Sequence, residues 1–72
     1  MEKRMYAVSV YERWDDGAWE FDGYVGIYHT RSEAIECAYH SIESSFDTRY
    51  YDVEIMSESM IRAGGLEDLI KT

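Results

Sequence analysis

The N-terminal part of the chain alternates between apolar and polar positions, a pattern typical of half-buried β-strands. The first run, Met5 to Trp14, has Tyr6, Val8 and Val10 on one face and Ala7, Ser9, Tyr11 and Arg13 on the other. A second run extends from about Trp19 to Tyr28, and Asp16-Gly17 lies between the two. Because Asp-Gly between two such runs favours a tight reversal, the pattern predicts an antiparallel β-hairpin.

Strict alternation assigns each side chain of the second run to a face. One face receives Trp19, Phe21, Val25 and Ile27, and the other receives Glu20, Asp22, Tyr24 and Tyr28. Gly23 and Gly26 interrupt the run, and glycine inside a strand indicates a bulge or a bend.

A helix is predicted after the hairpin, from Thr30 to about Ser44. Thr30 and Glu33 have the spacing of a capping box, in which each side chain bonds the backbone N–H of the other residue. Apolar residues then recur at helical spacing and define the face expected to pack inward: Ala34, Ile35, Ala38, Tyr39 and Ile42.

A third strand is expected from Arg49 to Met56, where the alternation returns. Tyr51, Val53 and Ile55 fall on one face, and Tyr50, Asp52, Glu54 and Met56 on the other. Residues 57–63 fit either a short helix or an extension of this strand. Gly64-Gly65 then interrupts the chain, and Leu66 to Ile70 has the pattern of one helical turn.

The element order β-β-α-β predicts a single α+β domain over residues 1–72. A right-handed crossover puts the third strand beside the first, so the antiparallel sheet has the order 2-1-3 with the helix on one face. We expect the helix to cover the apolar side chains of that face: Val8, Val10, Phe21, Val25, Ile27, Val53 and Ile55.

The opposite sheet face is expected to be open and acidic. Its outer strands present Glu20, Asp22 and Tyr24 on one side and Tyr50, Asp52 and Glu54 on the other, with Tyr11 on the central strand. Tyrosine is common at protein interfaces, and dense like charges destabilise a fold unless they serve a purpose. We interpret these seven residues as a partner-binding patch; the alternative is that the acidity only maintains solubility.

Composition narrows the classes of function. Fifteen Asp and Glu against seven Lys and Arg give a net charge of −8, which disfavours direct binding to nucleic acid or to anionic membranes. The single cysteine, Cys37, cannot form an internal disulfide, which favours the cytoplasm. The sequence has no apolar run of about 20 residues, the length of a membrane span. Charge repulsion between facing acidic patches predicts a monomer or a weak dimer.

Catalytic and metal-binding patterns are weak in this sequence. Cys37 and His40 have i, i+3 spacing, but a second such pair that would complete a zinc site is missing. Asp15-Asp16 and Glu67-Asp68 are explained by turn chemistry and by helix N-terminal preference. We therefore expect no enzyme activity, no cofactor and no metal, and we keep a hydrolase with an Asp/Glu pair as the alternative from another class.

The stretch from Tyr6 to Ile42 resembles the β-β-α core of HicB-type antitoxins. The resemblance is carried by Asp16-Gly17-x-Trp19 at the hairpin and by Thr30-x-x-Glu33-Ala34-x-x-x-Ala38-x-x-x-Ile42 on the helix. It implies binding to a small basic toxin ribonuclease.

In size, acidity, tyrosine content and element order, the whole chain is similar to phage-encoded anti-CRISPR proteins. That resemblance implies a way of acting, in which an acidic surface occludes the nucleic-acid channel of a host protein. Our first hypothesis is therefore an inhibitory module that binds a basic, nucleic-acid-handling protein in the host cytoplasm. The alternative is a HicB-like antitoxin or a small regulatory subunit with a basic partner.

Overall fold

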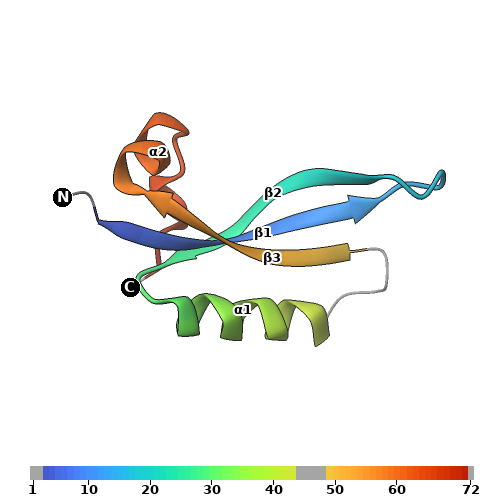
Figure 1. The fold of residues 1–72 in the computed structure, drawn as a ribbon, viewed down its shortest axis with the longest axis horizontal. Coiled ribbons are helices and arrows are strands. Elements are labelled where there is room, and N and C mark those ends of the chain that lie inside the picture. The colour runs from blue at the N-terminus through green and yellow to red at the C-terminus, as the bar shows by residue number, and fades with distance from the viewer. Residues whose placement is uncertain (1–2, 44–48, 72) are drawn as a thin grey trace.

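The computed structural model describes residues 3–43 and 49–71. In chain order, its elements are β1 (Arg4–Arg13), β2 (Trp19–Tyr28), α1 (Arg31–Glu43), β3 (Arg49–Ser57), α2 (Glu58–Ala63) and the 3₁₀ helix η1 (Glu67–Leu69). β1 pairs antiparallel with both neighbours, so the sheet has the order β2-β1-β3 (Figure 1). The predicted α+β fold and strand order are confirmed. The predicted helix end at Ser44 lies outside the described residues.

The hairpin turn forms where Asp-Gly predicted it. Gly17 has a φ of 88°, a left-handed conformation that favours glycine. The N–H of Trp14 donates to the carbonyl oxygen of Ala18 at 2.8 Å, and the Asp16 carboxylate accepts from the N–H of Ala18 at 2.9 Å. These bonds fix the pairing of β1 with β2 from the turn outward.

Helix α1 packs on one face of the sheet through small side chains. The Thr30 half of the capping box is present: the N–H of Glu33 donates to Thr30 Oγ1 at 3.3 Å. The Glu33 carboxylate bonds the Thr30 side chain, accepting from its hydroxyl at 2.8 Å from Oε1. Ala34 and Ala38 are buried against Val8. The half-buried side chains around this contact are Tyr6, Tyr28, Cys37, Tyr51 and Val53.

The predicted inward stripe of α1 was partly wrong. Tyr39 and Ile42 are 65% and 51% exposed, and Ile35 is only half-buried. The alanines allow the helix to approach the sheet closely, and the helix orientation that buries them turns Tyr39 and Ile42 toward solvent. Cys37, on the alanine side, is half-buried.

The C-terminal segment covers part of the opposite sheet face, which sequence reasoning left uncovered. Residues 58–63 form the helix α2, and Ser57, the last residue of β3, caps it: its hydroxyl accepts from the N–H of Met60 at 3.3 Å. Ile61 is buried on the sheet, and the N–H of Lys71 donates to the carbonyl oxygen of Ile27 at 2.7 Å. The buried cluster formed here comprises Met5, Ala7, Ile27, Met56 and Ile61.

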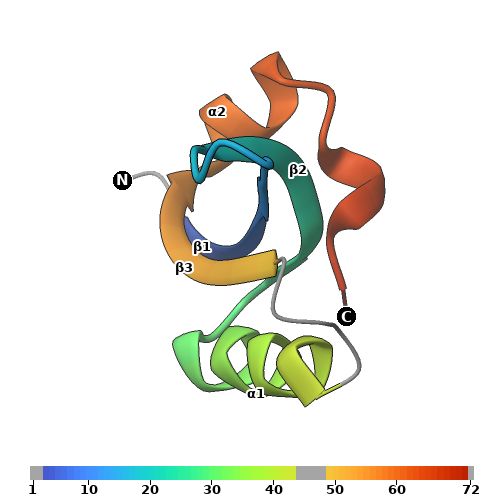
Figure 2. The same ribbon diagram turned by 90° about the vertical axis from the view of Figure 1, so that its right-hand side faces the viewer.

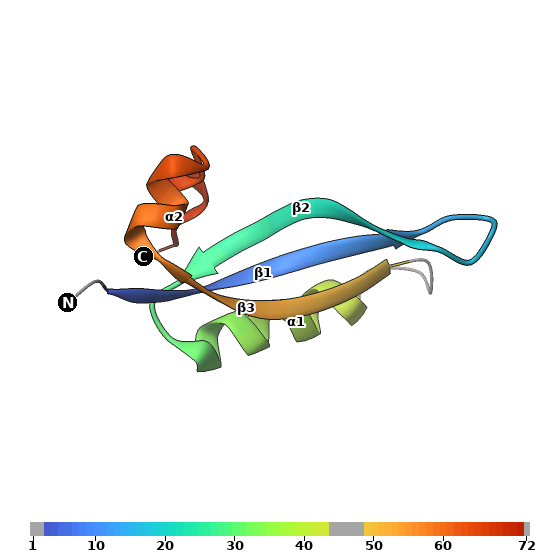
Figure 3. The same ribbon diagram turned by 45° about the horizontal axis from the view of Figure 1, so that its top comes forward.

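The two helices lie on opposite sides of a twisted sheet, as Figure 2 shows. α2 and η1 lie at the end where β1 begins, whereas the β1–β2 hairpin extends away from them (Figures 1 and 3). The molecule is consequently elongated and measures 42 × 23 × 18 Å. No helix within residues 3–43 and 49–71 has the length and apolar character needed to span a membrane.

Two irregularities in β2 change which side chains share a face. The register with β1 shifts between Val8 and Ser9 and again between Val10 and Tyr11. On β2 these shifts skip Val25 and Asp22, so neither residue has a direct partner on β1. Between them, Gly23 adopts a φ of 116°, which favours glycine at this position.

The predicted faces of β2 were wrong for most of the strand, because they were assigned by apolar character and not by pairing outward from the hairpin turn. Trp19 and Phe21 lie opposite Arg13 and Tyr11, on the sheet face away from α1. Ile27 lies opposite Ala7 and packs under the C-terminal segment rather than under α1. Only Tyr24, in the stretch between the two shifts, lies on the face predicted for it.

Candidate functional site: an aromatic face on the open end of the sheet

Five aromatic side chains form a continuous surface on the sheet face away from α1, at the hairpin end. We call this surface the aromatic face; its members are Tyr11, Trp19, Phe21, Tyr24 and Tyr50. All three strands contribute to it, because the register places Tyr11 opposite both Phe21 and Tyr50. Among the described elements, α2 and η1 pack on the other end of the same sheet face (Figure 3).

The rings contact one another in tilted and edge-to-face pairs. The Tyr11 ring centroid lies 5.6 Å from that of Phe21 and 5.4 Å from that of Tyr50. Trp19 and Tyr50 are 6.0 Å apart, and Phe21 and Tyr24 are 5.0 Å apart. These are the separations at which aromatic pairs attract each other, so the rings form one preorganised surface.

The aromatic face is exposed despite its apolar character. Phe21, Trp19 and Tyr50 are 47%, 48% and 50% exposed, although large aromatic side chains are usually well buried. Tyr11, Trp19 and Tyr50 also line a hollow of about 390 Å³. A contiguous exposed apolar surface of this kind marks an interaction site more often than it serves the fold.

Glu54 introduces a negative charge at the edge of the aromatic face. Its carboxylate accepts hydrogen bonds from the hydroxyls of Tyr11 and Tyr24, each at 3.3 Å. Burial, followed by the charge of Glu54 and these hydrogen bonds, raises the pKa of both tyrosines above the ordinary value. The two phenols therefore stay protonated and hold the half-buried carboxylate in place.

Asp52 is the second carboxylate on this face. It lies opposite Ser9 in the β1–β3 register, and its side chain is exposed. Its Oδ1 atom accepts from the N–H of Val53 at 2.9 Å. The buried Ser9 hydroxyl donates to the Asp52 carbonyl oxygen at 3.3 Å, which fixes this part of β3 against β1.

The structure brings together five of the seven predicted partner-binding residues. Tyr11, Tyr24, Tyr50, Asp52 and Glu54 share the face away from α1. Glu20 and Asp22 do not lie with them, which corrects the predicted double row of carboxylates.

Glu20 and Asp22 lie on the α1 side of the hairpin. Glu20 is opposite Glu12 in the register and accepts a hydrogen bond from Trp14 Nε1 at 2.6 Å. Arg49 on β3 is opposite Glu12 on β1. Its hydrogen bond with Tyr51 raises the pKa of the Arg49 guanidinium, and the charges of Glu12 and Asp22 raise it further. Glu20 and Asp22 thus belong to a mixed charged edge rather than to an open acidic patch.

Sequence reasoning missed Trp19 and Phe21 as members of the site. The signal that identifies them is the turn itself. Counting pairs outward from the Trp14–Ala18 hydrogen bond puts Arg13 opposite Trp19 and Tyr11 opposite Phe21. Assigning faces by apolar character instead placed both residues under the helix.

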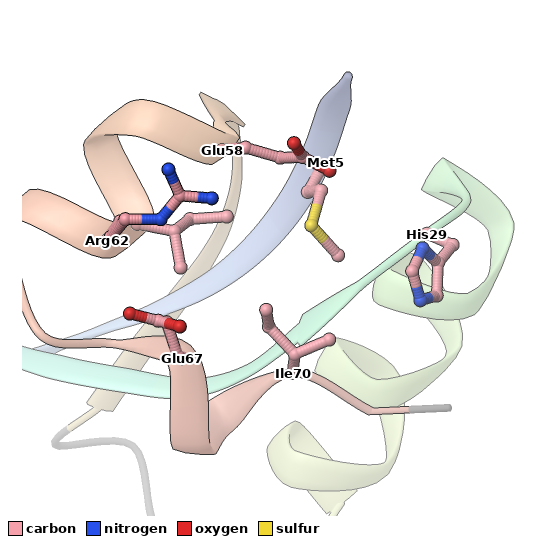
Figure 4. A pocket seen from close by; sticks show the side chains of 7 residues that line it. Met5, His29, Glu58, Arg62, Glu67 and Ile70 are labelled. Atoms are coloured by element: carbon pink, nitrogen blue, oxygen red, sulfur yellow. The ribbon is translucent and has the colours of Figure 1, made fainter. Parts of the chain in front are cut away.

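A second hollow, of about 170 Å³, lies between the C-terminal segment and the end of β2 (Figure 4). Met5, Ile61 and Ile70 supply its apolar part, His29 comes from the end of β2, and the charged side chains come from α2 and η1. Those charged side chains are Glu58, Arg62 and Glu67. Both signs of charge meet at the rim of a space lined by core residues, which is the arrangement expected where a short helix packs over a core.

A third hollow lies beside α1 and contains the candidate pair Cys37 and His40, together with Tyr28, Glu33 and Glu36. A hydrogen bond with Cys37, followed by burial, raises the pKa of Tyr28 to about 12. His40 Nε2 lies 3.9 Å from Glu36 Oε1. Within residues 3–43 and 49–71, no group of three or more His, Cys, Asp or Glu side chains is placed to hold a metal ion.

Comparisons with protein-family models, with curated proteins and with solved structures give no match for this chain. The HicB and anti-CRISPR resemblances therefore stay predictions. The aromatic face, with Asp52 and Glu54 beside it, is the feature from which a function can be argued.

Proposed function

We propose that this protein is an inhibitory protein-binding module that covers a basic, nucleic-acid-binding site on its partner. The observation that carries the proposal is the aromatic face. Its rings stay exposed at the hairpin end of a sheet that α1 covers in part on one face and α2 and η1 cover in part on the other, in a chain of net charge −8. Exposing such a surface costs solubility, so its retention is best explained by contact with another molecule.

The side chains of the aromatic face suit a protein partner. Tyrosine and tryptophan are enriched at interface hot spots, because each buries a large area while restricting few rotatable bonds. The rings already pack on one another at 5.0–6.0 Å, so little further ordering is needed on binding. The aromatic face would supply the short-range energy of the contact.

The charge of the molecule selects the kind of partner. Asp52 and Glu54 lie on the contact surface, and the whole chain is strongly acidic. Complementary potentials steer association and reject partners of like charge. A basic surface is therefore favoured, and the commonest strongly basic surfaces on proteins are those that bind nucleic acid.

Nucleic acid itself is a poorer candidate, although bases stack well on exposed aromatic rings. Proteins that bind single strands combine such rings with a positive groove. Among the described residues, the charged side chains of the face are Asp52, Glu54 and Arg13, which leave it acidic. Phosphates would meet net repulsion.

The way of acting that we propose is the one implied by the resemblance to phage-encoded anti-CRISPR proteins. The acidic module approaches a cationic channel, docks through its rings and prevents nucleic acid from entering. An antitoxin bound to a small basic ribonuclease would use the same surface and the same physics. The identity of the captured partner separates the two.

Affinity capture with matched variants tests the proposal. The double variant Trp19→Ala/Tyr50→Ala removes two exposed rings from the aromatic face, and Tyr39→Ala removes an exposed ring from α1 on the other side of the sheet. We expect wild type and Tyr39→Ala to retain one basic protein from host lysate and the double variant to lose it. The purified complex should then resist added nucleic acid.

Two outcomes would contradict the proposal. One is capture that depends on Tyr39 and not on Trp19 and Tyr50. The other is a partner that binds this protein and its nucleic acid at the same time, each with unchanged affinity.

A further inference from the structure

We propose that the hollow lined by Tyr11, Trp19 and Tyr50 receives an arginine side chain of the partner, with its guanidinium laid against the rings. This inference rests on the proposed function and names the residue type that the aromatic face recognises. Three aromatic side chains from three different strands line a hollow of about 390 Å³ that opens to solvent. The surface is apolar, yet it belongs to a strongly acidic chain.

An arginine of the chain itself already uses this chemistry. Arg13 lies opposite Trp19 in the β1–β2 register, and its Cζ atom is 6.0 Å from the centroid of the Trp19 ring. That distance is at the limit of about 6 Å for a cation–π contact, with tryptophan the strongest aromatic partner. Trp19 is therefore presented in a geometry that a guanidinium can approach.

The spacing of the rings favours a planar cation over a round one. An alkylammonium held in an aromatic cage needs rings on several sides, and two rings that enclose any group must be at least about 7 Å apart, since each van der Waals contact takes about 3.5 Å. Here the centroid of Tyr50 is only 5.4 Å from Tyr11 and 6.0 Å from Trp19, so these rings contact each other. A flat guanidinium can instead stack on the ring surfaces that line the hollow, where a trimethylammonium group would be enclosed on one side only.

The carboxylates beside the hollow supply the charge partner. Asp52 lies two residues from Tyr50 on β3, on the same sheet face, and its side chain is exposed. Glu54 is held nearby by the hydroxyls of Tyr11 and Tyr24. A guanidinium can stack on a ring and direct its N–H donors at a carboxylate in the same plane, whereas a lysine ammonium is more strongly hydrated.

Peptide binding to the purified protein tests the inference without knowledge of the partner. Four capped peptides of one length alternate glycine with arginine, lysine, trimethyl-lysine or citrulline. Ring-proton NMR shifts report the site, and titration gives the affinity. We expect the arginine peptide to bind about two- to fivefold more tightly than the lysine and trimethyl-lysine peptides, and the neutral citrulline peptide to bind most weakly.

Single substitutions should change the affinity for the arginine peptide in predictable directions. Trp19→Leu should weaken arginine-peptide binding several-fold, while Tyr39→Leu, on the opposite side of the sheet, should leave it unchanged. Arg13→Gln should tighten binding, because it removes a competing positive charge beside Trp19. Heteronuclear spectra of each variant establish that it is folded.

The inference is overturned if lysine or trimethyl-lysine peptides bind as tightly as the arginine peptide, or if the shifts map to α1. Its failure is distinguishable from failure of the proposed function. Capture of a partner that still depends on Trp19 and Tyr50 would leave the function standing without the arginine. Conversely, arginine-peptide binding at the hollow, together with partner capture that is unchanged when Trp19 and Tyr50 are replaced, would support the arginine site and contradict the proposed function.

Discussion

Small side chains at a few positions decide how closely the elements of this fold approach. Ala34 is fully buried and Ala38 is 8% exposed, where α1 packs on Val8. Interiors packed to crystal-like density do not accept added methylene groups without displacement of the surroundings. The small size of these alanines therefore contributes more to the packing of α1 than the modest apolar area that they bury.

Ala34→Leu should destabilise the domain by about 1–3 kcal/mol, because the added carbons force α1 away from the sheet. Glu36→Leu adds the same side chain on the exposed side of α1 and is the matched control. Urea denaturation measures both free energies of unfolding. Equal effects of the two substitutions would show that the alanine contact is not tight.

Tyr28, which packs beside the contact between α1 and Val8, makes the stability of the domain depend on alkaline pH. Its pKa is raised from 10.0 to about 12, first by the hydrogen bond with Cys37 and then by burial. The fold thus favours the neutral phenol, so this contribution to stability is complete below pH 10 and is lost as the pH rises toward 12.

Tyr28→Phe, which has no phenol to ionise, should therefore lose less stability than the wild type across this alkaline range. Tyr39→Phe, at an exposed tyrosine on α1, should follow the wild-type curve. The measurement is the free energy of unfolding at several alkaline pH values. Parallel curves for wild type and Tyr28→Phe would refute the assigned shift.

At the scale of elements, the irregular strand β2 determines the site. Its register shift at Asp22 lets Trp19, Phe21 and Tyr24 all reach the face away from α1, although strict alternation would put Tyr24 on the other face from the first two. Gly23, at a φ of 116°, lies between the shifts. Because glycine has no Cβ atom, Gly23 adopts this backbone conformation with little strain.

Gly23→Ala should destabilise the domain by about 1–3 kcal/mol, the usual cost of a non-glycine residue held in such a conformation. The space around Gly23 is open, so the cost would come from the backbone and not from a clash. Val25→Ala, at a position that the β1–β2 register skips, removes a partly exposed side chain and should destabilise the domain less. Thermal unfolding ranks the two, and the reverse order would contradict this account of the bulge.

For the whole molecule, the distribution of charge predicts how the protein meets its partner. Asp52 lies on the aromatic face, while Asp22 lies on the α1 side of the hairpin near Arg49. Asp52→Lys and Asp22→Lys change the net charge equally. If the aromatic face makes the contact, Asp52→Lys should slow association with the captured partner more than Asp22→Lys does, because a local charge steers the final approach.

Surface plasmon resonance at several salt concentrations checks this prediction. Association should slow as salt rises, since exposed charges are screened over about 10 Å at 0.1 M. Equal rates for the two reversals would mean that only the net charge matters. Rates indifferent to salt would remove the electrostatic part of the proposal.

Self-association should become stronger as salt rises, whereas association with the basic partner should become slower. Two copies meeting through their aromatic faces would bury apolar rings but would also bring two acidic molecules together. We expect monomers at low salt and a growing fraction of dimers as salt screens the repulsion, reduced by Trp19→Ala. Sedimentation equilibrium measures this, and a tight dimer at low salt would show that repulsion does not control the assembly.

The sequence by itself determined the three strands, α1 and their order. Alternation marked the strands, the Thr30–Glu33 capping box marked the start of α1, and Asp16-Gly17 marked the hairpin. These signals are local, since each depends on residues within one turn or one strand. With the right-handed crossover they were sufficient for the strand order β2-β1-β3.

Only the tertiary structure decided which side chains meet. Strict alternation cannot show where a bulge reverses the phase of β2, and one such shift moves the following side chains to the other face. The same limit applied to α2, because residues 57–63 fitted either a helix or a strand by pattern, and Glu58–Ala63 is helical where Ile61 packs on the far sheet face. Pairing outward from the turn put Trp19 and Phe21 on the far face, and the site changed from a double row of carboxylates to an aromatic face with Asp52 and Glu54 beside it. The register beyond the bulges and the packing of α2 depend on contacts between residues far apart in the chain, and the local pattern does not encode them.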